Sequence, residues 1–227
     1  MRYLPLPLSA HRSAWGVDTA GVERQCRGDA ADAPCRFCGA FAAGRQEVFH
    51  LDGDHANHAP ANLTAACSLC HLAQHLDVAA RQRSVVLAWL PEVSQAAVFM
   101  LTRSAHLALL DADADPTLEV HPARGTPATV AAWRALKALL GREEQANARL
   151  KTSDPGVLGA ALLALTSGAY RGRANLLGSI RLVPTGRMLV GGEDIYPGLL
   201  RAWAGRAEPK ASAPLPASTP AAPRRAA

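Results

Sequence analysis

Apolar residues recur at helical spacing through the second half of the chain, and each such run has start and stop signals. Ser94 caps a predicted helix that reaches about Leu110. Thr126 caps a second one, with Pro127 at its first position and Gly141 after its end. That helix continues or restarts through residues 142–150. Asp154 begins another helix predicted to run to about Gly168.

Shorter apolar runs predict strands. Ser84–Leu90 is rich in β-branched and apolar residues and is stopped by Pro91, which indicates a buried strand. Glu47–Leu51 predicts a second short strand, followed by a loop and by a helix over Ala66–Leu76. A last strand is expected within residues 175–184, and a short helix within residues 193–203. Short strands followed by a mainly helical body define an α+β protein.

Four regions follow from these patterns. Residues 1–25 form an extended segment, because prolines in LPLPL exclude a helix, and Trp15 is expected to dock it onto the body. Residues 26–80 hold nearly all the cysteine and histidine, and residues 81–206 form the helical body. Residues 207–227 are rich in proline and alanine and are expected to be disordered.

The charge and the apolar runs of the chain argue against two classes of function, nucleic-acid binding and membrane insertion. The 227 residues carry a net charge of +5, which is a weak signature for nucleic-acid binding. No stretch reaches the roughly 18 apolar residues of a membrane span, and the first residues do not form a secretory signal. We therefore expect a cytoplasmic protein without direct membrane insertion. In a reducing compartment, paired cysteines indicate a metal site rather than disulfides.

Two cysteine pairs have the spacing of a structural zinc site. Cys35 and Cys38 form one CxxC pair and Cys67 and Cys70 the other, with 28 residues between them. Two such turns can surround one tetrahedral Zn²⁺ ion. The alternative is two unrelated redox pairs, although no βαβ unit surrounds them. Cys26 stands outside both pairs.

The segment from CRFCG to EVFHLDGDHANHAPANLTAACSLCH resembles the HNH endonuclease (ββα-metal) pattern. The resemblance implies an HNH-like zinc module in which His50 is the general base, Asn62 steadies the loop and His71 binds the catalytic metal. Phe49, however, occupies the position of the first metal ligand, and a phenyl ring offers no lone pair. Substitutes could come from the loop residues Asp52, Asp54, His55 or His58, and His75 lies one helical turn beyond His71. Either an active nuclease or a non-catalytic scaffold fits this pattern.

A second resemblance covers more of the chain. The segments LPLPLSA, CRFCGAF, LDGDHANHAPANLTAACSLC, LAWLPEVSQ and KTSDPGVLGAALLAL occur in one order and are similar to the IcmJ (DotN) family of type IVB (Dot/Icm-like) secretion systems. This resemblance implies a non-catalytic adaptor that binds the C-terminal extension of the coupling ATPase and other coupling-complex proteins, and helps recruit effector substrates. It also implies recruitment to the inner membrane and a structural zinc ion on Cys35, Cys38, Cys67 and Cys70. The family position that corresponds to His50 is not a histidine, so this chain is closer there to the nuclease pattern.

Overall fold

The computed structural model describes residues 3–16, 33–122 and 125–205 of the chain. The predictions for Cys26 and for the tail at 207–227 fall outside these residues. So does the part of the predicted first region that follows Gly16.

Within the described ranges, the fold combines short antiparallel strand pairs with helices, which agrees with the predicted α+β class. The strands are β1 (Glu47–His50), β2 (Leu63–Ala66), β3 (Val85–Trp89), β4 (Ile180–Pro184), β5 (Leu189–Val190) and β6 (Glu193–Asp194), paired β1–β2, β3–β4 and β5–β6. The α-helices are α2 (Ser68–His71), α3 (Leu76–Arg81), α4 (Gln95–Asp111), α5 (Pro127–Leu140), α6 (Glu143–Leu150), α7 (Pro155–Leu163), α8 (Ser167–Arg171), α9 (Arg173–Leu177) and α10 (Tyr196–Trp203). Two 3-10 turns are η2 (Pro60–Asn62) and η3 (Leu72–Gln74).

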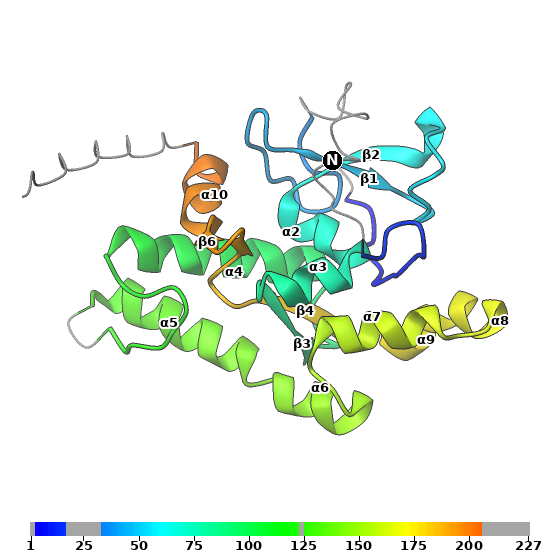
Figure 1. Cartoon of the computed structure of the whole chain (residues 1–227). Coiled ribbons are helices and arrows are strands. Elements are labelled where there is room, and N and C mark those ends of the chain that lie inside the picture. Colours follow the sequence, from blue (N-terminus) through cyan, green and yellow to red (C-terminus); the bar gives the residue numbers. More distant parts are fainter. Residues whose placement is uncertain (1–2, 17–32, 123–124, 206–227) are drawn as a thin grey trace, which may run out of the picture.

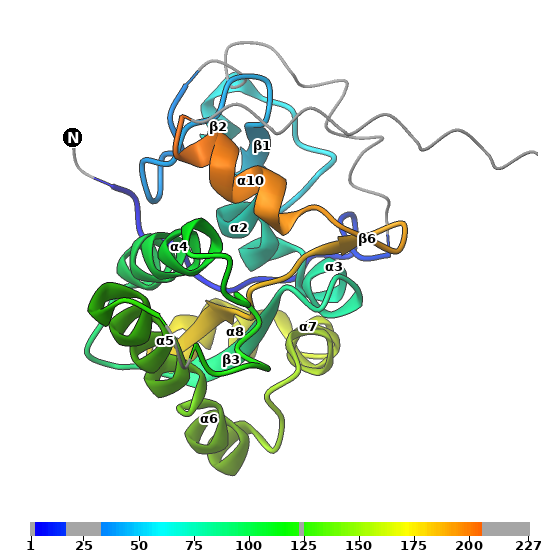
Figure 2. The same cartoon turned by 90° about the vertical axis from the view of Figure 1, so that its left-hand side faces the viewer.

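The β1–β2 hairpin lies on one side of α2 and α3, and α5, α6 and α7 lie on the other side of the molecule (Figure 1). Between these layers, β3 and β4 pair antiparallel, with Val85 opposite Pro184 and Trp89 opposite Ile180. Turned by a quarter, the molecule shows α10 across the face formed by α2 and α4 (Figure 2). One apolar core is shared by the cysteine- and histidine-rich region and the helical body, and it includes Cys35, Phe37, Leu158 and Tyr196.

The predicted helix starts at Ser94, Thr126 and Asp154 are confirmed. The side-chain oxygens of these residues accept hydrogen bonds from backbone N–H groups in the first turns of α4, α5 and α7. Each such cap contributes about 1 kcal/mol to helix stability. Strands β1, β3 and β4 and the restarted helix α6 also lie where the patterns place them.

Two predicted helices have the wrong bounds. The helix expected over Ala66–Leu76 is replaced by the last residue of β2, the short helix α2, the 3-10 turn η3 and the first residue of α3. Ala66 is not helical because it pairs with Glu47 of β1. His75 has non-helical backbone angles, with φ −124° and ψ 59°, which separate η3 from α3. The helix expected to reach Gly168 ends at Leu163, since Thr166 caps a separate helix, α8.

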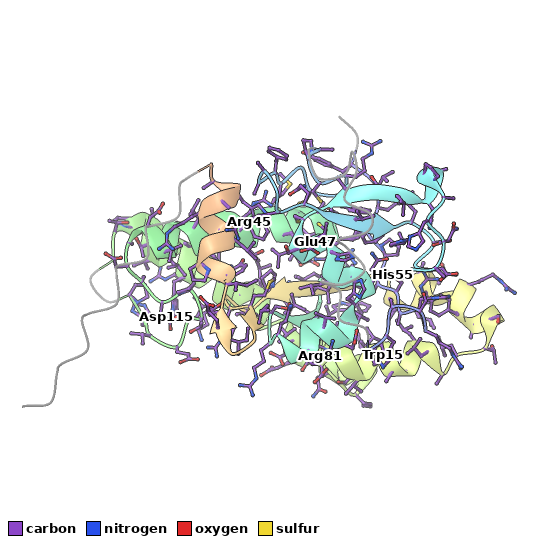
Figure 3. The ribbon with its side chains drawn as sticks, turned by 45° about the horizontal axis from the view of Figure 1, so that its top comes forward. Trp15, Arg45, Glu47, His55, Arg81 and Asp115 are labelled. Atoms are coloured by element: carbon purple, nitrogen blue, oxygen red, sulfur yellow. The ribbon has the colours of Figure 1, made fainter. Side chains whose placement is uncertain are left out.

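Trp15 fixes the first segment to the body, as expected, and it does so through a glycine. A Cβ atom added at Gly159 in α7 would lie 2.5 Å from Cζ3 of Trp15 and 3.0 Å from Cβ of Leu76 in α3. Trp15 lies beside these two helices (Figure 3). The weak helix propensity of Gly159 is therefore offset by close packing.

We predict that Gly159→Ala destabilises the protein by about 1–2 kcal/mol. Alanine gains roughly 1 kcal/mol of helix propensity, but its Cβ would lie only 2.5 Å from Trp15 and 3.0 Å from Leu76, so overpacking should cost about 2–3 kcal/mol, the upper part of the usual range. Gly168→Ala in α8 is the matched control, because nothing lies within 4 Å of its added Cβ. Urea unfolding measures both variants. A Gly159→Ala protein as stable as wild type would contradict the close packing.

Candidate metal centres

The first cysteine pair lies in a tight turn that needs a glycine. The backbone N–H of Cys35 donates to the carbonyl of Ala40, and that of Gly39 donates to the carbonyl of Cys35, both at 2.9 Å. Gly39 has φ +72°, and a Cβ there would lie 2.5 Å from Oη of Tyr3. A residue with a side chain would be strained at this position and would clash. The turn therefore directs both thiols to one side.

The second cysteine pair follows the β1–β2 hairpin. Cys67 directly precedes α2, and its carbonyl accepts a hydrogen bond from the N–H of His71 at 2.9 Å. Cys70 lies within α2. The N–H of Arg36 donates to the carbonyl of Ala65 at 2.9 Å, which holds the first turn against β2.

These contacts bring the four predicted cysteine ligands together. Their Sγ atoms all lie within 4.8 Å of one another, and all four side chains are buried. Sγ of Cys38 and Sγ of Cys67 are 3.6 Å apart. A Zn²⁺ ion with Zn–S bonds of about 2.3 Å places tetrahedral sulfurs about 3.8 Å apart. The cluster could therefore hold a metal ion, and its donor set fits zinc. The cysteines are free rather than disulfide-bonded, and their burial disfavours the redox alternative.

The pKa values of the thiols are shifted in opposite directions, and the guanidinium of Arg103 lies next to them. Hydrogen bonding with Cys35 lowers the pKa of Cys38, whereas burial raises the pKa of Cys70. Nη1 of Arg103 in α4 donates to Sγ of Cys38 at 3.6 Å. Four thiolates around a Zn²⁺ ion carry a net charge of −2, which this guanidinium partly offsets. Sequence reasoning missed Arg103, because it lies 65 residues from Cys38.

The residues that the nuclease pattern singles out are placed as follows. His50 ends β1 opposite Leu63, and both of its ring nitrogens are buried without a hydrogen-bond partner among the described residues. The side chain of Asn62 donates to Oδ1 of Asp52 at 2.8 Å and accepts from the N–H of Asp52 at 3.0 Å, so it does hold the loop. Phe49 packs its ring against Phe37, with centroids 4.5 Å apart.

A second cluster lies beside His50. His55 from the loop, His71 from α2 and His75 after η3 are all buried, and one ring nitrogen from each lies within 4.8 Å of the others. Nε2 of His71 and Nε2 of His75 are 3.2 Å apart. Nδ1 of His71 is 2.6 Å from Oε2 of Glu47. Glu47 and His55 lie on the side of the hairpin that faces α2 (Figure 3).

Burial favours the neutral form of His50, His55 and His75. It lowers the pKa of His55 to about 4 and lowers the pKa of His50 and of His75, with the neighbouring histidines adding to the effect. Neutral imidazoles retain the lone pairs that bind metals. The HNH resemblance indicated His71, and the spacing of one helical turn indicated His75. The sequence left His55 as one of several loop candidates and did not indicate Glu47.

Comparison with models of known protein families and with curated proteins finds no match for this chain. None of the helices in the described ranges has the length and apolar composition needed to cross a bilayer. The fold and the two clusters together define an α+β protein with a buried group of cysteines and a buried group of histidines, each able to hold a metal ion.

Proposed function

We propose that the chain is a non-catalytic, zinc-stabilised adaptor of a type IVB secretion coupling complex. It binds the C-terminal extension of the coupling ATPase, contacts other coupling-complex proteins and helps recruit effector substrates. In this proposal it is a cytoplasmic protein that reaches the inner membrane through the complex. The ordered IcmJ (DotN)-like segments support this proposal, together with an HNH-like module whose catalytic position is closed.

The burial of His50, the residue in the position of the general base, is the main observation that supports the proposal. A general base must come within hydrogen-bond reach of the water it activates and close to the scissile phosphate. His50 is only 2% exposed and stacks on His55, with ring centroids 4.4 Å apart. The first segment lies over the loop, where Oγ of Ser13 donates to Asp54 and accepts from the N–H of His55, both at 2.9 Å. Phosphate therefore has no direct approach to His50.

An apolar groove elsewhere suits a partner segment. It has a volume of about 570 Å³ and lies between α4 and α5, with small residues such as Ala105, Ala132 and Ala135 along it. Leu101 is 54% exposed at this groove. Small side chains leave room for larger apolar side chains of a helix or an extended peptide. We propose that the ATPase extension occupies this groove.

Titration calorimetry with the isolated C-terminal extension of the ATPase tests this function. We expect Leu101→Glu to weaken binding at least tenfold, because a carboxylate would be buried against apolar partner atoms. Leu176→Glu in α9 is the matched control, since Leu176 is 69% exposed and lies outside the groove. No binding by the wild-type chain would refute the adaptor function, and equal binding by both variants would refute the groove.

A metal-dependent endonuclease is the second candidate, because the three clustered imidazoles lie next to His50. Its test is digestion of plasmid DNA with Mg²⁺, Mn²⁺, Ni²⁺ or Zn²⁺. Cleavage by the wild-type chain that disappears in His50→Ala would establish the nuclease and overturn the adaptor proposal. We expect no cleavage above that of the variant.

A further inference from the structure

We propose that His55, His71 and His75 form a second metal site, separate from the four cysteines, which takes a borderline divalent cation such as Zn²⁺. The site draws one imidazole from the loop after β1, one from α2 and one from the residue between η3 and α3. It does not use the strand position where the nuclease pattern has its first ligand, since Phe49 stands there. The proposal does not depend on the adaptor function.

Glu47 gives the site its orientation. A carboxylate oxygen accepts hydrogen bonds, so Nδ1 of His71 donates to Oε2 of Glu47 over the 2.6 Å that separates them. That hydrogen bond leaves the lone pair on Nε2 of His71, which faces Nε2 of His75. A carboxylate that holds the far nitrogen of a ligating histidine is a recurrent feature of zinc sites.

The spacing of the nitrogens fits one ion. Zinc–nitrogen bonds of about 2.0–2.1 Å place two tetrahedral ligands about 3.3 Å apart. Nε2 of His71 and Nε2 of His75 are 3.2 Å apart. Two neutral imidazoles can also share a proton at this distance, but such a pair leaves the third histidine unexplained.

The third histidine supplies independent support. Nε2 of His55 is buried and has no hydrogen-bond partner in the described structure. A buried polar nitrogen without a partner costs about 1–3 kcal/mol. Binding a cation with this lone pair removes that cost. Three imidazoles leave one position of a tetrahedral ion for water.

An ion here would add a link between three parts of the chain. It would tie the loop after β1 to α2 and η3, and the loop in turn holds Ser13 of the first segment through the N–H of His55. Neutral nitrogen ligands bind Zn²⁺ without the charge that four thiolates provide. We therefore expect this site to lose its metal to a chelator before the cysteine site does.

Metal content of the full chain tests the proposal. After incubation with Zn²⁺ and removal of unbound metal, mass spectrometry should give two zinc ions per wild-type chain. His55→Ala and His75→Ala should each give one. His58→Ala, a histidine of the same loop outside the cluster, is the matched control and should keep two.

Cobalt distinguishes the two sites in the same proteins. One equivalent of Co²⁺ should fill the cysteine site and produce thiolate charge-transfer bands. A second equivalent should fill the histidine site and add only ligand-field absorption. The His55→Ala variant should lack the absorption added by the second equivalent. One zinc ion in the loaded wild-type chain, or two in His55→Ala, would overturn the proposal. If His75→Ala fails to fold, the loop variant His55→Ala still decides the question.

Discussion

Replacing Cys67 by serine should remove the zinc ion of the cysteine site and unfold the region from residue 33 to residue 80, so that an ion on the histidine cluster is lost as well. Cys67 is fully buried and its Sγ lies among those of Cys35, Cys38 and Cys70. Structural zinc contributes on the order of 10–16 kcal/mol to the folding of small metal modules. That is as large as the whole stability of a typical domain, about 5–15 kcal/mol. Since the cysteine cluster belongs to the main apolar core, the loss should spread into the helical body.

The measurement combines metal analysis with thermal unfolding, with and without a chelator. Cys26→Ser is the matched control, because it makes the same chemical change at the cysteine outside both CxxC pairs. We expect the control to keep its zinc and its melting temperature. A wild-type protein that is purified without zinc and takes none up, or a Cys67→Ser protein that melts like wild type, would refute the structural zinc site.

Local signals in the sequence predicted much of this fold. Ser94, Thr126 and Asp154 cap helices because each places a side-chain oxygen three residues or fewer before an unpaired N–H, and only neighbouring residues decide this. The CxxC pairs were equally readable, since ligand spacing within a turn is local. We could predict that the two pairs lie together because a tetrahedral zinc ion needs four ligands, although the sequence does not show how the chain brings them together.

Long-range pairing was the part that the sequence did not reveal. Residues 63–66 lack a strong strand pattern and become β2 only because β1 offers hydrogen bonds to them. The same holds for the contact between Arg103 and Cys38 and for that between Glu47 and His71. These contacts depend on where α4 and the β1–β2 hairpin pack, and the spacing of residues along the sequence does not reveal this. His55 joins the histidine cluster for the same reason.

His106 should make the protein sensitive to acid. It lies fully buried in α4, with Nδ1 hydrogen-bonded to Oη of Tyr196 at 2.9 Å and Nε2 without a partner in the described structure. Burial lowers the pKa of His106 to about 3, from 6.5 in an exposed histidine. Above pH 6.5 the ring is neutral in both the folded and the unfolded chain, so it imposes no penalty. As the pH falls from 6.5 towards 3, only the unfolded chain takes up the proton, and the free energy of unfolding decreases.

The variant His106→Asn isolates this contribution, because asparagine keeps a polar atom near Tyr196 but cannot be protonated. One histidine lowers the free energy of unfolding by up to about 1.4 kcal/mol per pH unit. The free energy of unfolding of the wild type should therefore fall by about 1.5 kcal/mol relative to that of the variant between about pH 6.5 and about pH 5. Urea unfolding at several pH values measures both free energies, and effects of the other buried histidines cancel in the difference. His121→Asn makes the same substitution at an exposed histidine and serves as the control for the substitution itself. A constant difference between wild type and His106→Asn would mean that water reaches the His106 ring in the folded protein, and that the contact between α4 and α10 opens readily.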